Sequence, residues 1–114
     1  MAIVEKIICD YLTAQVAPAY PEMPETMPAR LILVERTGGG ISNRLRYATI
    51  AIQSYAGSLY EAAQLNESVI TAMDSIGQQP NIGRAQLNSN YNFTDTTRKE
   101  YRYQAVYDVV YFEE

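Results

Sequence analysis

Three consecutive glycines, Gly38, Gly39 and Gly40, are the residues of this 114-residue chain best suited to cradle a phosphate. Glycines without a Cβ allow backbone N–H groups to approach a phosphate closely. The run lacks the Gly-Lys-Ser/Thr ending of a P-loop, and it joins two expected strands rather than a strand and a helix. The sequence therefore favours a flexible hairpin tip over a phosphate site.

Two charge clusters could bind a ligand of opposite sign. Glu22 and Glu25 could hold a cation, but nothing in their spacing fixes a coordination geometry, and solvated carboxylates are the simpler interpretation. Arg98, Lys99 and Arg102 lie beside tyrosines, a combination that can bind single-stranded nucleic acid by stacking and phosphate contacts. Three positive charges on an acidic chain favour cross-strand packing of the tyrosine rings instead.

The composition excludes several classes of site. The chain has no histidine and one cysteine, so disulfide frameworks, zinc fingers and Ser-His-Asp or Cys-His catalytic groups cannot form within one copy. Cys9 is expected to be a small buried apolar residue. Without a paired nucleophile and base, we predict no catalytic, metal-binding or cofactor-binding residues and no enzymatic activity.

The overall balance of residues indicates one globular domain spanning residues 1–114. Hydrophobic residues make up 47% of the chain and charged residues 19%. The net charge of −4 argues against a broad face that grips nucleic-acid backbone. No apolar run reaches the roughly 18 residues that a membrane-spanning helix needs.

The elements that must position these residues follow from the spacing of the apolar positions. Apolar residues recur about every 3.6 positions over residues 3–16, which predicts an amphipathic helix that stops before Pro18. Residues 17–28, here called the proline arm, contain four prolines and are expected to be an extended arm or loop. Residues 31–36 and 44–55 are expected to form a two-stranded hairpin.

The second half of the chain predicts one helix and two strands. Ser58 and Glu61 have the spacing of a capping box that opens a helix, and Gly77 is expected to end it. Residues 82–88 indicate a weaker strand, and residues 88–99 a polar connection. Residues 101–112 are the strongest strand, and it is expected to be central because both of its faces become apolar.

The order α-β-β-α-β-β predicts an α+β two-layer sandwich, with a four-stranded, mainly antiparallel sheet and both helices on one face. The first and third strands would then be the edges of the sheet. Exposed edges are either protected or used for pairing with another chain. We therefore expect a subunit interface along the first strand, at Ile32, Val34 and Arg36.

Connecting segments with isolated large side chains indicate contacts with a partner. The chain has ten tyrosines, and their faces could be either core or subunit interface. The proline arm and residues 37–43 and 88–99 lack periodic apolar residues, so each is expected to be mobile. The residues expected to dock a partner are Met23, Met27, Gly38, Gly39, Gly40, Tyr91, Phe93 and Arg98.

Five segments resemble the small neck proteins of long-tailed bacteriophages, above all the tail-terminator or tail-completion family of siphophages and Gram-positive prophages. The similarity extends from Ala29 to Phe112. The segments are 34–39 (VERTGG), 48–55 (ATIAIQSY), 59–63 (LYEAA), 88–95 (NSNYNFTD) and 101–108 (YRYQAVYD).

The resemblance implies a structural virion protein that forms a ring, typically a hexamer, which caps the tail tube and joins it to the head. Its partners would be further copies of itself, the tail-tube protein and a head-completion protein, with no membrane involved. DNA would pass through the ring without specific binding, and a weakly acidic wall would let it slide because a basic wall would hold it. Assembly would take place in the bacterial cytoplasm.

Two alternatives remain open. The chain could be a head-completion (head-closure) neck protein, since the lengths of these families overlap. It could also be a stand-alone ligand-binding or regulatory α+β domain of a host bacterium. Capsid, portal and tail-tube genes on either side would favour the phage interpretation.

Overall fold

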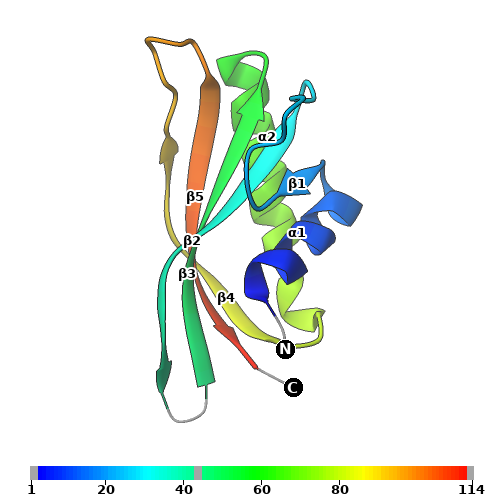
Figure 1. Cartoon of the computed structure of the whole chain (residues 1–114), viewed down its shortest axis with the longest axis vertical. Helices are drawn as coiled ribbons and strands as arrows, with labels where there is room; N and C mark the ends of the chain where they lie inside the picture. The colour runs from blue at the N-terminus through cyan, green and yellow to red at the C-terminus, as the bar shows by residue number, and fades with distance from the viewer. Residues whose placement is uncertain (1–2, 43–44, 113–114) are drawn as a thin grey trace.

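The computed structural model describes residues 3–42 and 45–112, which form a twisted sheet with two helices on one of its faces (Figure 1). The elements in chain order are α1 (Val4–Gln15), β1 (Ala19–Tyr20), β2 (Leu31–Ser42), β3 (Leu45–Ala56), α2 (Leu59–Met73), the short 3-10 turn η1 (Ile76–Gln78), β4 (Ile82–Asn92) and β5 (Tyr101–Tyr111).

The sheet has five strands in the order β1-β2-β3-β5-β4 and is mixed. β1 runs parallel to β2, pairing Ala19 with Ile32 and Tyr20 with Leu33, whereas all other neighbours are antiparallel. The predicted four-stranded sheet and the order α-β-β-α-β-β are therefore wrong. The missing strand, β1, lies inside the proline arm, and its two residues are too few to show any alternation of apolar and polar positions.

A small second cluster explains why the proline arm contributes a strand. Leu31, Leu33 and Tyr55 are buried on the face of the sheet opposite the helices, and the half-buried Tyr20 packs against them. Pairing of β1 with β2 holds the Tyr20 ring over these apolar side chains, so tertiary burial rather than local propensity forms this strand.

Two strands extend beyond their apolar patterns. β2 continues to Ser42 because β3 pairs with its glycines, and β4 continues to Asn92 because β5 pairs with it. The sequence pattern predicts loops at residues 37–42 and 88–92. This prediction is wrong, because both segments are strand residues. Asn43, the last residue of the expected glycine tip, lies outside the described residues.

Several local expectations are confirmed. The Oγ of Ser58 accepts a hydrogen bond from the Glu61 N–H at 3.2 Å and opens α2. β5 is central, between β3 and β4.

The predicted end of α2 at Gly77 is wrong, since the helix stops at Met73 and Gly77 lies in the separate turn η1. The expectation failed because the apolar spacing runs on through the turn, where Ile76 is still buried.

The main core lies between the helices and the sheet. Cys9 is buried in it, as expected, and its burial raises the pKa of the thiol to about 11, with Asp10 and Glu5 adding to the shift. The buried residues of this core include Ile8, Leu12, Ile32, Val34, Ile50, Ile52, Leu65, Val69, Met73, Ala105, Tyr107 and Val109.

Tyr107 carries a buried hydroxyl that has no hydrogen-bond partner among the described residues. Burial raises its pKa to about 12, and the nearby Asp74 adds to the shift. Because an unsatisfied buried hydroxyl is costly, Tyr107→Phe is expected to stabilise the fold by about 1 kcal/mol at neutral pH. Urea unfolding with Tyr60→Phe as the control, at a tyrosine 73% exposed, measures this.

Tyr107→Phe should also change how the stability of the fold depends on pH in the alkaline range. The pKa of Tyr107 is higher in the folded chain than the ordinary value of 10.0, so the folded chain holds this proton more tightly. Its contribution to stability is complete below pH 10 and is lost as the pH rises towards 12. Tyr107→Phe should lose less stability than the wild type over that interval. A variant less stable than the wild type at pH 7 would mean that the hydroxyl has a partner.

Candidate functional site

The helix-free face of the sheet carries a connected row of polar side chains that crosses four strands. The Nε2 of Gln53 donates to the Oε1 of Gln104 at 2.9 Å and to the Oε1 of Glu35 at 3.3 Å. The Tyr55 hydroxyl donates to the Oε1 of Gln53 at 2.8 Å, and the Nε2 of Gln104 donates to the Tyr91 hydroxyl. Gln53 and Gln104 are both buried, so the row holds β2, β3, β5 and β4 in one register.

Next to this row, Arg102 of β5 organises two aromatic rings. Its guanidinium carbon lies 4.5 Å from the centre of the Phe93 ring and 5.5 Å from that of Tyr55. Its Nη1 donates to the Tyr55 hydroxyl and its Nε to the Phe93 carbonyl, both at 2.7 Å. Phe93 also meets Tyr91 edge to face, with ring centres 5.9 Å apart. We call Tyr91, Phe93 and the Arg102 guanidinium the aromatic shelf.

The predicted docking residues fall into separate places. Tyr91 and Phe93 come together on the shelf, 41% and 39% exposed. Arg98 lies in the loop between β4 and β5 (residues 93–100, the β4–β5 loop), where it makes an exposed ion pair with Glu100 at 3.5 Å. Met23 and Met27 are exposed in the proline arm, at the other edge of the sheet. The structure therefore brings two of the predicted residues into direct contact.

The residues predicted for the subunit interface do not share one environment. Ile32 and Val34 are fully buried, with their side chains in the main core, and Arg36 is exposed. The Ile32 N–H donates to the Pro18 carbonyl at 2.8 Å, so β1 already occupies this part of the edge. Side-chain contacts of Ile32 and Val34 with another subunit are therefore ruled out in this fold, and only Arg36 keeps an exposed position.

The glycine run lies in the outer half of β2 and serves close strand packing. A Cβ on Gly39 would collide with the Tyr47 carbonyl oxygen, and the Arg36 side chain lies across this glycine. The Nε of Arg36 donates to the Gly38 carbonyl at 3.3 Å. A Cβ on Gly40 would meet nothing within 4 Å. Gly39 is therefore required by the fold, whereas Gly40 leaves open space for a neighbouring group.

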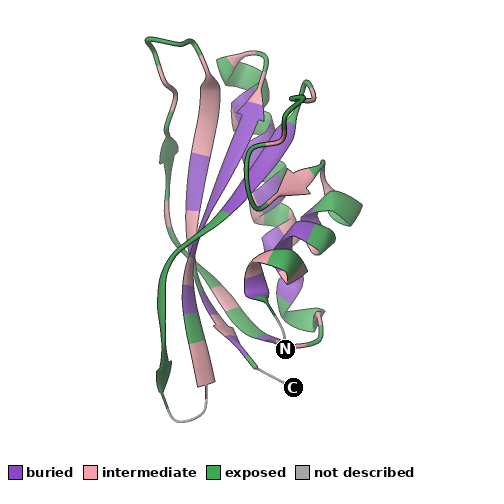
Figure 2. Cartoon of the chain, in the orientation of Figure 1, coloured by how far each residue is buried: buried purple, intermediate pink, exposed green. Residues whose placement is uncertain are grey.

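Both sides of the sheet have strand edges that are open to pairing. Within residues 3–42 and 45–112, no strand pairs with the outer side of β2 beyond Leu33 or with the outer side of β4. Residues 35–42 are all exposed, in contrast to the buried first residues of the same strand (Figure 2). Unpaired edges are templates for another strand.

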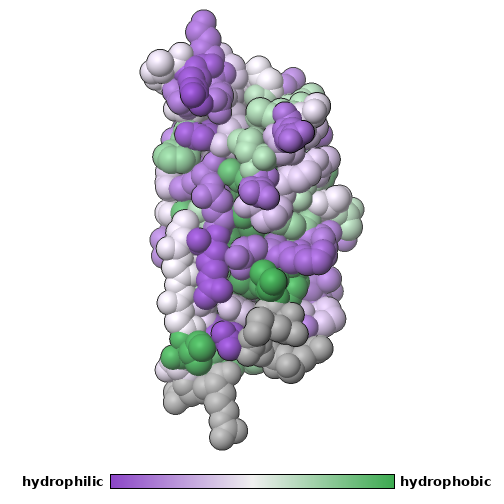
Figure 3. Space-filling model, in the orientation of Figure 1, coloured by the Kyte–Doolittle hydropathy of each residue, from purple (hydrophilic) through white to green (hydrophobic). Residues whose placement is uncertain are grey.

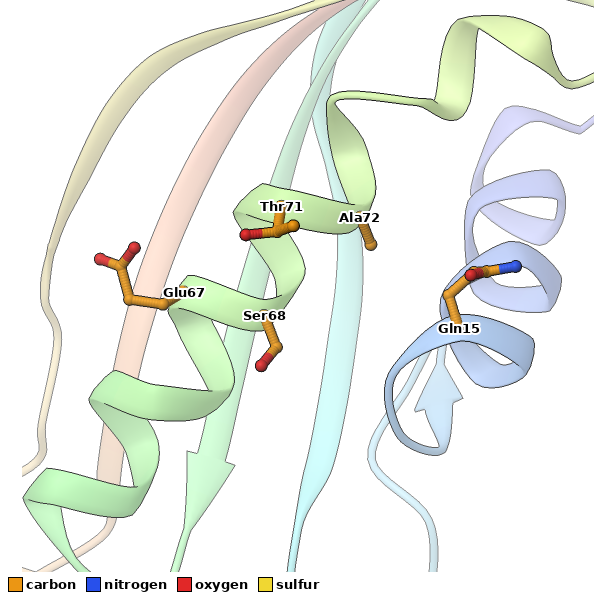
Figure 4. A pocket seen from close by; sticks show the side chains of 5 residues that line it. All are labelled: Gln15, Glu67, Ser68, Thr71 and Ala72. Atoms are coloured by element: carbon orange, nitrogen blue, oxygen red, sulfur yellow. The ribbon is translucent and has the colours of Figure 1, made fainter.

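The hollows of the surface are lined by both polar and apolar atoms. One of about 180 Å³ lies beside the glycine run and is lined by Tyr47, Thr49, Arg84 and Asp108, among others. Another, of about 400 Å³, lies between the helices, where Gln15 comes from α1 and Glu67, Ser68, Thr71 and Ala72 from α2 (Figure 4). The Glu67 carboxylate points away from α1.

Both linings place a hydroxyl and a carboxylate in the same hollow: Ser68 and Thr71 with Glu67 in the larger one, and Thr49 with Asp108 in the smaller one. Within residues 3–42 and 45–112, no hydrogen bond joins these hydroxyls to the carboxylates, which is the contact by which a base activates a nucleophile. Across the described part of the chain, no group of three or more His, Cys, Asp or Glu side chains could hold a metal ion. The strand edges and the aromatic shelf are therefore the stronger candidates for a functional surface.

The face shown in Figure 3 is mixed in polarity. Hydrophilic residues gather at the end with the β4–β5 loop and also cross the middle, and the most apolar patches lie in the half toward the β2–β3 hairpin. Ile41, near the tip of that hairpin, is 64% exposed. None of the helices described here is long and apolar enough to span a membrane.

Comparison of the chain with protein-family models and with curated proteins finds no match in either case. Its function is therefore inferred from the sequence and from the geometry of these surfaces.

Proposed function

We propose that this chain is a structural subunit of a bacteriophage neck, a tail terminator that forms a ring on the tail tube and joins it to the head. The observation that carries the proposal is the pair of unpaired strand edges at opposite sides of one sheet, on β2 and on β4. The sequence resemblance over residues 29–112 supports the family, and the edges supply a way for copies to associate.

The strand directions suit a head-to-tail ring. Since each neighbour from β2 through β3 and β5 to β4 is antiparallel, β2 and β4 run in opposite directions. Copies related by rotation about an axis along the strands would set β4 of one copy antiparallel to β2 of the next. Such a contact joins two different surfaces and closes into a ring when the rotation closes. β1 limits the contact on β2 to residues 35–42.

Bulges on both edges favour controlled assembly. The register shifts between Arg36 and Gly38 in β2, and β4 has two further shifts. Bulges twist an edge and oppose indiscriminate pairing. The free subunit is therefore expected to stay monomeric until a tail tube presents a template. The weakly acidic chain would line or surround the DNA path without holding DNA.

A proline at Ile41 tests the edge contact. Ser42 and Leu45 close the hairpin as a pair, so alternation along the ladder points the Ile41 N–H away from β3. Ile41→Pro removes this outward donor at an exposed position, and it should shift the melting temperature by only a few degrees. We expect it to abolish ring formation and co-sedimentation with tail tubes, assayed by negative-stain microscopy and centrifugation. Ile41→Ala, which keeps the N–H, is the matched control.

The outcomes separate the candidates. Rings and tube binding that persist in Ile41→Pro would show that the β2 edge is not the contact. A wild-type protein that sediments with DNA-filled heads and not with tail tubes would instead support the head-completion alternative. A wild-type protein that binds neither structure would contradict a neck role altogether.

A further inference from the structure

Residues 21–28 of the proline arm form an irregular segment with unused contact groups. They adopt neither helix nor strand, bend at residues 21–22 and 25–26, and are exposed except for Pro24 and Pro28. Met23 and Met27 are 41% and 50% exposed. Glu22 and Glu25 are exposed and have no ion-pair partner among the described residues. Such a segment offers flexible apolar anchors and two carboxylates.

The aromatic shelf and the β4–β5 loop offer the complementary chemistry. The rings of Tyr91 and Phe93 are partly exposed and are held rigidly by each other and by Arg102. The β4–β5 loop carries two further exposed cations, Lys99 and Arg98, of which Arg98 is paired with Glu100 at 3.5 Å. Aromatic surfaces bind proline-rich segments, and thioethers pack favourably on aromatic rings.

The two features lie at the same end of the molecule but on opposite edges of the sheet (Figure 1). One cross-strand row joins them: Leu31 pairs with Tyr55, Tyr55 pairs with Arg102, and the Phe93 N–H donates to the Arg102 carbonyl at 2.9 Å. The proline arm ends just before Leu31, at one end of this row, and Phe93 is at the other. Neighbouring strands are about 4.8 Å apart, so the intervening strands keep the arm away from its own shelf.

We propose that the proline arm of one copy docks on the aromatic shelf and the β4–β5 loop of the next copy, with Met23 and Met27 against the rings and Glu22 and Glu25 facing Arg98 and Lys99. This inference rests on the proposed head-to-tail ring. When β4 of one copy lies beside β2 of another, the aromatic shelf of the first copy lies next to the proline arm of the second, because both features are at the same end of the strands. Glu22 and Glu25 are opposite in charge to Lys99 and to Arg98, whose exposed pair with Glu100 a docked carboxylate would share, and the docking is continuous with the proposed edge contact.

A charge exchange tests this docking. We expect Glu22→Lys with Glu25→Lys, and separately Arg98→Glu with Lys99→Glu, each to weaken ring assembly about tenfold, because like charges then face each other across every subunit contact. The chain that carries all four changes restores opposite charges and should assemble within about threefold of the wild type. Sedimentation velocity with tail tubes as template measures assembly, and thermal unfolding verifies that each variant folds.

The control for the Glu22 and Glu25 variant is Asp10→Lys with Glu67→Lys, which makes the same change in net charge on the helix layer, where it should leave assembly unaffected. Double variants that assemble as well as this control, or a fourfold variant as weak as the doubles, would overturn the docking while leaving the ring intact. Variants that form rings but lose the tube would assign the arm to the tube and also overturn it. Only a wild type that neither forms rings nor binds tubes would count against the proposed function as well.

Discussion

Ile32→Pro is expected to unfold the subunit rather than to block assembly selectively. Ile32 is fully buried, and its N–H donates to the Pro18 carbonyl at 2.8 Å. Proline removes that donor, cannot fit a strand that is paired on both sides, and deletes a large core side chain. The first effect alone costs about 3 kcal/mol or more, and the lost apolar burial adds to it. Urea unfolding should show little or no native protein.

Ile41→Pro is the control for this prediction, because it places the same residue in the exposed half of the same strand. The free energy of unfolding should be much lower for Ile32→Pro than for Ile41→Pro. This difference measures how much pairing with β1 and packing in the core stabilise the first half of β2. If Ile32→Pro instead retained a cooperative transition close to that of the wild type, the pairing of β1 with β2 would not be part of the native state.

Gln53→Ala is expected to destabilise the fold by about 3 kcal/mol. The side chain is 7% exposed and bonds to Gln104, Glu35 and Tyr55, so its removal leaves several partly buried polar groups without this partner. Each such group typically costs about 1–3 kcal/mol when it is left unsatisfied, although Tyr55 keeps its bond from Arg102. Chemical denaturation at neutral pH measures the loss.

A double variant separates hydrogen bonding from packing in this row. Gln53→Leu combined with Gln104→Leu removes both ends of the central hydrogen bond and fills the volume with apolar groups. Replacing both partners in this way is often nearly neutral, so the double variant should be more stable than Gln53→Ala. A double variant less stable than Gln53→Ala would mean that the row contributes through its connection to Glu35 and Tyr91 rather than through the pair itself.

The elements that the sequence alone determined are those set by local interactions. The period of apolar residues over 3–16 predicts α1, and the Ser58–Glu61 spacing predicts the start of α2, because both features depend on residues a few positions apart. The apolar character of residues 101–112 on both faces predicts that β5 is central. The exclusion of histidine-based and disulfide chemistry needs only the composition.

The polar row lay within reach of the sequence but was missed. Gln53 directly follows the run Ile50, Ala51 and Ile52, which is apolar on both faces of β3, and a glutamine in such a place must find hydrogen-bond partners. That signal indicates a buried polar contact, yet it cannot name Gln104 as the partner, because the pairing of β3 with β5 joins residues 51 positions apart.

Only the tertiary structure decided the edges of the sheet. β1 has two residues and forms because Tyr20 covers Leu31 and Leu33, and this strand turns Ile32 from an edge residue into a core residue. The glycine run becomes strand because β3 supplies a ladder partner for residues that have little strand propensity of their own. Local preferences therefore define the helices and the central strands, whereas long-range pairing and burial define which backbone remains open to another subunit.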